Sequence, residues 1–238
     1  MLKFFLKFFL VLIIGAVGGI LSTQILWPYF IEKPFFEKYK IKETPTQIIQ
    51  KEEIRIQENT ALTEAIEKIQ NKIVVITSKT SFGKWIDGSG VVITNDGLVL
   101  TLASLVPAGT ESYLFLDGKK FTPTVLKRDY KNNLALLKIE QTNLGVAPFV
   151  KIEDIKLGDR VFLLWASFKN EKRQNSVNEG IIKTFNEDFV ETNITETYAV
   201  QGSPLFNIKG EMIGLNILDA TGKVKAISIQ KIKDFTGF

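Results

Sequence analysis

The 238-residue chain contains neither cysteine nor histidine. Without cysteine it forms no disulfide and has no thiolate chemistry, and its redox compartment stays undetermined. The lack of histidine excludes more, because a Ser-His-Asp or Cys-His relay needs an imidazole that takes up and returns a proton near neutral pH. Histidine-ligated zinc is excluded for the same reason. We therefore expect no metal and no cofactor.

An excess of charge of one sign is also missing. Lys and Arg number 30 against 26 Asp and Glu, which gives a formal net charge of +4. Residues 1–50 hold six lysines and three glutamates, so most of this excess lies there and the rest is close to neutral. Without a basic patch, a nucleic-acid partner is not expected. A hydrophobic content of 45% is enough to bury a sizeable core.

The longest hydrophobic run lies near the N-terminus. Residues 8–26 are uncharged and mostly apolar, and Trp27 and Pro28 follow them. A helix of this length crosses a bilayer core of about 30 Å, with aromatic residues at the interface. We predict an uncleaved membrane anchor over residues 8–30, after a short tail over residues 1–7. A cleaved signal peptide is the alternative, although the run is long for one and no clear Ala-x-Ala site follows.

The segment after the anchor changes in character. Lysines flank both ends of the apolar run, so the positive-inside rule does not choose its orientation. Residues 31–59 are charged and interrupted by proline, which predicts a tether. Residues 60–71 predict a short helix with Leu62, Ile66 and Ile69 on one side.

From residue 72 onward the signals are those of β-strands. Residues 73–77 form a β-branched run, and residues 88–101 read as two strands joined at Asn-Asp-Gly, a strong hairpin signal. Short strands with turn signals at this spacing indicate a barrel or a sandwich, and periodicity does not decide between them. The strand residues expected to point inward include Val92, Leu98, Leu136 and Ile213.

A family resemblance carries the interpretation further. Residues 189–216 read FVETNITETYAVQGSPLFNIKGEMIGLN, and residues 88–101 read GSGVVITNDGLVLT. The chain here resembles the trypsin-like serine peptidases, most closely the bacterial HtrA/Deg branch, whose corresponding stretch is TDAAxNPGNSGGPLxNxxGExIGxN. LGDRVFLLWASF and SVNEGIIKT are similar to that branch's LGDxVxAIGNPFG and SVTxGIVS. The resemblance runs from about residue 65 to residue 229, in the family's order.

This resemblance implies a mainly β, trypsin-like double β-barrel behind an N-terminal transmembrane helix. The domain would cover residues 72–238, with six-stranded barrels over about 72–140 and 156–232, and we expect no PDZ domain after it. Likeness to membrane-anchored HtrA proteins implies a single-pass protein whose folded domain lies outside the cytoplasm.

The resemblance also assigns positions to catalytic roles, and each role is filled by an unsuitable residue. Ser104 takes the place of the histidine base, and a hydroxyl lacks its basicity and its second nitrogen. Asn133 takes the place of the aspartate and carries no charge. Gln201 takes the place of the nucleophile, although its amide is not nucleophilic. Ala199 replaces an oxyanion-hole glycine, which puts the geometry of that hole in doubt.

Two further positions have alternative interpretations. Ser203 lies just past the nucleophile position and suggests a Ser-Lys dyad, or else it fills a tight corner. Lys225 falls near the family's specificity pocket, or else it is a surface lysine whose head group reaches water.

Together these features predict a membrane-anchored, catalytically inactive HtrA-like protein that binds a peptide or protein. The expected binding surface is the strand after Gly214, with Ile217, Leu218 and Asp219, together with Lys225. It would act alone or as a regulatory or scaffold subunit of a homo- or hetero-trimer. The alternative is an active serine-type endopeptidase of protein quality control with a non-standard catalytic arrangement.

Overall fold

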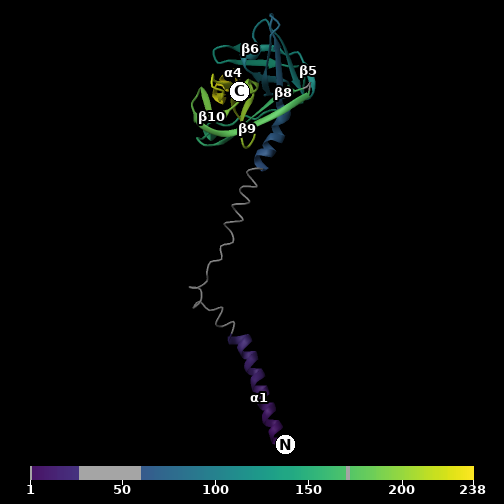
Figure 1. The fold of residues 1–238 in the computed structure, drawn as a ribbon, viewed down its shortest axis with the longest axis vertical. Helices are drawn as coiled ribbons and strands as arrows, with labels where there is room; N and C mark the ends of the chain where they lie inside the picture. The colour runs from purple at the N-terminus through teal and green to yellow at the C-terminus, as the bar shows by residue number, and fades with distance from the viewer. Residues whose placement is uncertain (1, 27–59, 170–171) are drawn as a thin grey trace. The chain divides into compact units, whose positions relative to one another are not determined.

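The computed structural model describes residues 2–26, 60–169 and 172–238 (Figure 1). The chain divides into two compact units, residues 1–53 and residues 54–238, which are described in turn. The predicted tether over residues 31–59 lies outside the described residues.

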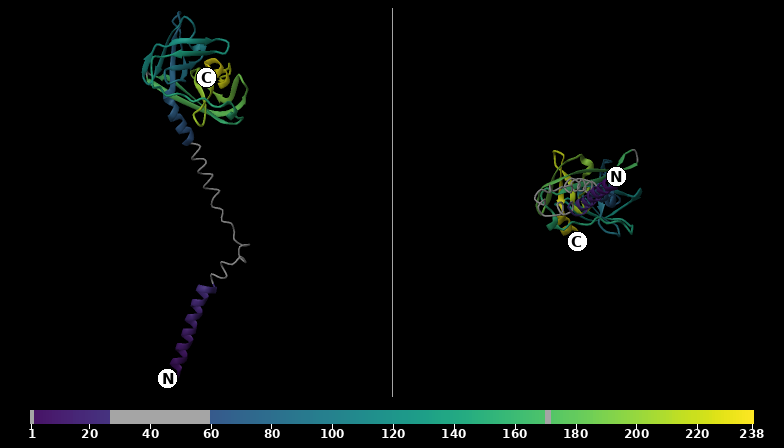
Figure 2. Two further views of the ribbon diagram at one scale, coloured as in Figure 1. Left: turned by 180° about the vertical axis from the view of Figure 1, so that it is seen from behind. Right: turned by 90° about the horizontal axis from the view of Figure 1, so that it is seen from below.

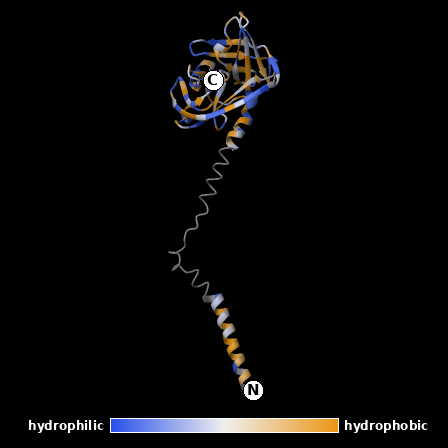
Figure 3. Cartoon of the chain, in the orientation of Figure 1, coloured by the Kyte–Doolittle hydropathy of each residue, from blue (hydrophilic) through white to orange (hydrophobic). Residues whose placement is uncertain are grey.

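The first unit contains one long apolar helix. Helix α1 spans Leu2–Leu21 and continues into a π-helical turn, η1, over Ser22–Leu26. Its segment Lys7–Gln24 has a mean hydropathy of 1.7 and is long and apolar enough to cross a membrane, and Figure 3 shows the hydrophobic colour along it. A membrane anchor and a signal sequence both fit this helix. The helix takes in most of the predicted N-terminal tail, and the end of the predicted anchor lies outside the described residues.

The second unit begins with a helix that packs on the β-structure. Residues 60–69 are helical, and the 3-10 turn η3 follows over Gln70–Lys72. Ala65 and Ile69 are buried in the core, and Leu62 and Ile66 pack against it partly exposed. The spacing of these residues places them on one side of the helix, which is the side that the core covers.

Two β-sheets make up the rest of the unit (Figures 1 and 2). Within the described residues the first has seven strands in the order β5-β4-β1-β2-β3-β7-β6, and the second is a closed barrel in the order β10-β13-β12-β11-β8-β9. The strands of the first sheet are β1 Ile73–Lys79, β2 Trp85–Val92, β3 Leu98–Thr101, β4 Glu111–Leu116, β5 Lys119–Phe121, β6 Thr124–Asp129 and β7 Leu134–Lys138. Those of the barrel are β8 Arg160–Lys169, β9 Lys172–Phe185, β10 Phe189–Thr195, β11 Pro204–Asn207, β12 Met212–Leu218 and β13 Lys223–Ser228, and helix α4 Ile229–Thr236 follows β13.

The prediction of a mainly β, trypsin-like fold is confirmed, with one difference. The first sheet is a half-barrel of seven strands rather than a closed six-stranded barrel, because its end strands β5 and β6 do not pair with each other. A three-residue edge strand such as β5 offers little template for pairing with another chain.

The segment between the two sheets ties them together by backbone hydrogen bonds. The Ala147 N–H donates to the Val92 carbonyl in the first sheet (3.2 Å), and the Val150 N–H donates to the Met212 carbonyl in the barrel (3.0 Å). Met212 returns a hydrogen bond from its own N–H to the Pro148 carbonyl (2.7 Å). The linker is therefore part of the folded body.

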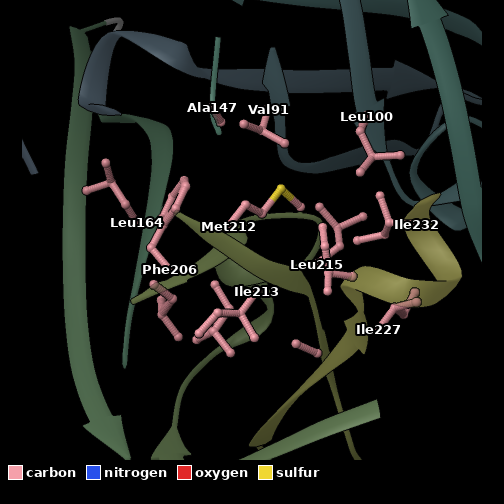
Figure 4. Close-up of a cluster of buried hydrophobic side chains, with 14 of the residues drawn as sticks. Val91, Leu100, Ala147, Leu164, Phe206, Met212, Ile213, Leu215, Ile227 and Ile232 are labelled. Carbon is pink, nitrogen blue, oxygen red and sulfur yellow. The ribbon is translucent and has the colours of Figure 1, made fainter. Parts of the chain in front are cut away.

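The largest hydrophobic cluster draws residues from both sheets. Figure 4 shows Val91 and Leu100 of the first sheet beside Phe206 and Leu215 of the barrel. On β1, Ile73 and Val75 belong to this shared cluster, whereas the intervening Val74 belongs to a second cluster on the far face of the sheet. A strand buried on both faces needs apolar residues at every position, which explains the unbroken β-branched run.

The expected core residues divide into two pairs. Val92 and Ile213 are buried, as predicted. Leu98 and Leu136 are only partly buried, although both pack against the shared cluster. Leu98 is the first residue of β3, and Leu136 lies on β7 next to the edge strand β6. Alternation along one strand does not reveal which strands lie next to it.

Leu137→Ala tests this core. Leu137 is fully buried, so the variant should lose about 2–5 kcal/mol of unfolding free energy through lost burial and a residual cavity. Urea denaturation of the full chain measures this. Leu126→Ala is the matched control, because Leu126 is 54% exposed and should change stability by less than about 0.5 kcal/mol. Equal losses in the two variants would contradict this assignment of the core.

Candidate functional site

Ser104 and Asn133 are brought together by the fold. Ser104 is exposed in the 3-10 turn η4, Ala103–Leu105, which follows β3. Asn133 precedes β7 with a φ of 55°, a left-handed conformation that asparagine tolerates better than most residues. Its side-chain Oδ1 accepts a hydrogen bond from the Ser104 N–H (2.9 Å), and its carbonyl accepts one from the Ala103 N–H (3.2 Å). The Asn133 amide thus fixes the backbone of the Ser104 turn.

Gln201 occupies a corner between the short helix η6, Tyr198–Val200, and β11. Its N–H donates to the Tyr198 carbonyl (3.1 Å), and its own carbonyl accepts from the Ser89 N–H of β2 (2.9 Å). The next residue, Gly202, has a φ of 76°, and a Cβ there would collide with the Ser89 carbonyl and meet Leu105 Cδ1 at 2.7 Å. Since Leu105 adjoins Ser104, the three positions converge at one corner.

The backbone N–H groups that follow Ala199 are hydrogen-bonded within the turn. Ala199 lies inside η6 and is not among the described residues with positive φ, so it does not adopt the conformation that favours glycine. The Val200 N–H donates to the Thr197 carbonyl (3.3 Å), as the Gln201 N–H does to that of Tyr198. An oxyanion hole requires free N–H groups aimed at one point. The Gln201 N–H, one group that would serve there, is engaged inside the turn.

Ser203 is fully buried and hydrogen-bonded. Its Oγ donates to the Val200 carbonyl (2.7 Å) and accepts from the Asn216 side-chain amide (3.0 Å). The Asn216 N–H also donates to the Ser203 carbonyl (2.8 Å). A nucleophile must reach the carbon that it attacks, and this hydroxyl is instead used to hold the corner against β12. The geometry therefore favours the tight-corner interpretation over a Ser-Lys dyad.

The end of β12 carries the predicted binding strand. Ile217 pairs with Lys225 and Leu218 pairs with Val224, both on β13. On the other side of β12, the pairing with β11 ends at Leu215, followed only by the hydrogen bonds between Asn216 and the corner. Among the described strands, the half-buried Ile217 and Leu218 therefore have a strand neighbour on one side only.

Asp219 lies just beyond this strand, in the turn that joins β12 to β13. Its carboxylate accepts hydrogen bonds from the Thr221 hydroxyl and N–H (2.7 Å each) and from the Lys223 N–H (3.0 Å). The Thr221 hydroxyl is the main cause that lowers the pKa of Asp219 below its ordinary value. Asp219 therefore shapes the turn and does not extend the strand.

Lys225 is ion-paired on the wall of the barrel. Its Nζ lies 3.1 Å from Glu191 Oε1 and 4.2 Å from the centre of the Phe189 ring. The side chain is partly exposed, as expected for a lysine whose stem covers apolar surface while its head group stays in water. This placement matches the surface-lysine interpretation.

Two cavities adjoin this region, and neither was predicted from the sequence. One of about 350 Å³ is lined by Asn133, Phe189, Ile217 and Ile227, among others. A larger one of about 810 Å³ lies between the first sheet and β8 and reaches Ala199. The alternate aromatic residues Tyr113 and Phe115 were a signal for the larger cavity, because they share one face of β4.

Substitutions of Asn133 test its structural role. Asn133→Ala should destabilise the chain by about 2 kcal/mol, because it loses the hydrogen bond to Ser104 and strains a left-handed residue. Asn133→Gly keeps the backbone freedom and should lose only about 1 kcal/mol. Asn133→Asp keeps the acceptor and should be close to neutral. Urea unfolding at pH 7 ranks the three, and equal stability of the Ala and Asp variants would contradict this role.

Comparisons with known proteins agree with this fold and its motifs. A family model described as "Trypsin-like peptidase domain" matches residues 88–215. A probable periplasmic serine endoprotease DegP-like of Halomonas elongata is 32% identical over 138 residues, which is 54% of this chain and 28% of the relative. Serine protease HTRA4 of Mus musculus is 31% identical over 163 residues, 62% of this chain and 33% of the relative.

The chain thus spans about a third of the length of the curated relatives that it matches. A crystal structure of the serine endoprotease from Yersinia pestis shares the fold with a TM-score of 0.66 at 23% identity, covering 74% of this chain and 65% of that one. On these matches the chain belongs to the trypsin-like peptidase family and is a homologue of its HtrA/DegP-type serine peptidases.

Proposed function

We propose that this chain is a non-catalytic HtrA-like protein that binds peptide or protein segments beside a membrane, to which α1 anchors it. One observation carries the proposal. The position of the general base holds Ser104, whose N–H is fixed by Asn133 in a chain without any histidine. The relative from Halomonas elongata is named periplasmic, which supports a folded domain outside the cytoplasm.

The chemistry of the corner supports binding without cleavage. A serine hydroxyl at position 104 does not take a proton near neutral pH, and the Asn133 amide carries no charge to stabilise an imidazolium. The side chain of Gln201 is not a nucleophile, and the hydroxyl of Ser203 is buried. The groups that would have to act in peptide hydrolysis are used here to hold the backbone.

The open side of β12 supports strand addition. An extended peptide placed beside the open side of β12 would bond the backbone of Leu218, which faces that side because Asn216 and Asp219 next to it in the ladder bond the corner and β13, and this needs no catalytic group. The cavity of about 350 Å³ that Ile217 helps to line would receive one side chain of that peptide. Asp219 and Lys225 hold the turn and the neighbouring strand in place. The same edge would serve a regulatory or scaffold subunit in a homo- or hetero-trimer.

The full chain should cleave nothing. In detergent it should leave unfolded casein intact, and a fluorophosphonate probe should label no serine.

Gln201→Ser should stay inactive because it lacks a base, and Ser104→His because it lacks a nucleophile, since triad members act as a unit. The triple variant Ser104→His, Asn133→Asp, Gln201→Ser should remain weak until Ala199→Gly is added. Strong turnover by Gln201→Ser alone, or labelling that Ser203→Ala abolishes, would contradict the proposal.

Backbone methylation tests the strand-addition mode. A capped hexapeptide of alternating Val and Thr should bind the full chain. Two methylated versions are compared, one N-methylated at the odd-numbered residues and one at the even-numbered residues. One version should lose binding and the other should keep it. The reason is that alternate N–H groups of an added strand face its neighbour. Fluorescence polarisation of the labelled peptide measures this. Equal effects of the two methylation patterns would exclude strand addition. Binding of the unmethylated peptide to Ile217→Asp is the control for where on the chain the peptide binds.

A further inference from the structure

The hairpin between β1 and β2 presents aromatic side chains to the surroundings. Residues 79–85 read KTSFGKW, and Phe82 at the turn is 97% exposed, more than any other large hydrophobic side chain among the described residues. Trp85, three positions later, is half exposed. Figure 1 shows this hairpin, in blue, projecting from the top of the second unit. Two aromatic side chains therefore lie uncovered at one tip.

Hydrogen bonds hold the turn in a fixed shape. The Thr80 N–H donates to the Lys84 carbonyl (2.9 Å), and the Gly83 N–H donates to the Thr80 carbonyl (2.8 Å). The Lys84 N–H donates to the Thr80 hydroxyl (3.0 Å). Below the turn, β1 pairs with β2 without a break up to the last residue of β1 and the first of β2. The exposure of Phe82 thus belongs to a well-bonded turn and not to a frayed end.

The charges around Phe82 are mostly positive. Two lysines flank it within residues 79–85, which contain no acidic residue. Lys79 Nζ lies 5.7 Å from the centre of the Trp85 ring, so its stem can follow the aromatic surface while its head group stays in water. On β4, Glu111 is directly opposite Lys79 and offsets one of the two charges. The turn beyond this pair is therefore positive.

These features fit a lipid surface better than a protein partner. A specific protein interface buries about 1,200–2,000 Å² in total, and a single turn offers much less. A bilayer interface accepts aromatic side chains at the depth of the head groups, with lysines reaching the phosphates beside them. Anionic lipids attract such lysines further. The composition of the tip therefore matches a bilayer surface of negative charge.

The proposed anchoring makes a weak contact of this kind effective. From free solution, one short tip would bind a bilayer only marginally, because stable attachment needs more than one signal. Helix α1 contains the segment that is long and apolar enough to supply the first signal. A domain already tied to a bilayer meets that bilayer at a high effective concentration. The hairpin then needs to supply only the second signal.

We propose that the β1–β2 hairpin is a reversible membrane contact of the folded domain. The Phe82 ring enters the boundary between head groups and acyl chains, and Trp85 lies at the depth of the head groups. Lys79 and Lys84 bind the phosphates of anionic lipids. The inference rests on the proposed anchoring by α1 and goes beyond it, because it determines which end of the domain faces the bilayer.

Site-specific fluorescence tests the contact, since a chain without cysteine takes a label at one chosen position. Ser81→Cys, beside Phe82, is labelled in the full chain with the environment-sensitive fluorophore NBD. The chain is placed in nanodiscs of equal parts phosphatidylcholine and phosphatidylglycerol, with or without doxyl-labelled lipid. The label should show blue-shifted emission and strong quenching by the doxyl lipid. The same label at Leu126→Cys, an exposed position on the edge strand β6, should show neither.

Substitutions at the tip separate insertion from mere proximity to the bilayer. In the labelled Ser81→Cys chain, Phe82→Ala should lower the ratio of docked to undocked chains by about tenfold, because the inserted ring is lost. Lys84→Gln should lower it by about fivefold, and only when phosphatidylglycerol is present. Both side chains are exposed, so the melting temperature should stay the same.

The inference is overturned if the label at position 81 is quenched no more than the label at position 126, or if Phe82→Ala leaves the quenching unchanged. It is also overturned if the blue shift needs no lipid and grows with protein concentration, because a second copy would then cover the hairpin. Failure of the proposed function looks different. A chain that does not enter the nanodiscs is not anchored by α1, whereas an anchored chain without quenching at position 81 contradicts only the hairpin contact.

Discussion

One set of backbone hydrogen bonds at the Gln201 corner holds the two β-sheets together. The Ser89 N–H of β2 donates to the Gln201 carbonyl (2.9 Å), and the Gly202 N–H donates to the Asn216 carbonyl of β12 (2.9 Å). The backbones approach so closely that side chains are excluded. A Cβ at Gly88 would meet Leu105 Cδ1 at 2.5 Å and the Gln201 carbonyl at 2.9 Å. The corner is therefore a structural junction, and the larger cavity reaches it at Gly88 and Ala199.

For the non-catalytic protein that we propose, this junction explains how the fold of a peptidase family is kept. The side chains at the corner satisfy backbone groups: Asn133 binds the Ser104 N–H, and Ser203 binds the Val200 carbonyl. Buried backbone groups must be paired, so these contacts stabilise the fold whether or not a substrate is present. The end of β12 has a strand neighbour on one side only among the described strands, and this supports the proposed binding of an extended chain.

Much of the fold could be predicted from the sequence because its signals are local. The Asn-Asp-Gly turn and the β-branched run of β1 predicted the strands, and the family resemblance predicted their arrangement. The half-barrel was missed because closure depends on whether β5 and β6 meet, which no local pattern records. Leu98 and Leu136 were expected to be buried because alternation shows a face and not its neighbours.

The sequence could predict which residues form the candidate site. It could not predict the contacts that these residues make. Alignment to the family motifs identified Ser104, Asn133 and Gln201, but the bond from Ser104 to Asn133 and the burial of Ser203 depend on the folded backbone. The larger cavity joins residues from Val75 to Ala199, which are far apart in the sequence. Only the pairing of β1 with both β2 and β4 places Thr77, Asp87 and Tyr113 in one row.

Hydrogen exchange at the corner tests the central claim most directly, namely that the corner is a fixed junction and not a loop that can rearrange for catalysis. The amides to follow by NMR are those of Ser89, Gly202 and Ser203, all hydrogen-bonded and buried. If the corner is a junction, they exchange only through global unfolding, at the same free energy as the strand amides of Val91 and Leu215. Exchange of the three that is orders of magnitude faster than that of the strands would show that the corner opens while both sheets stay folded, and would contradict the account.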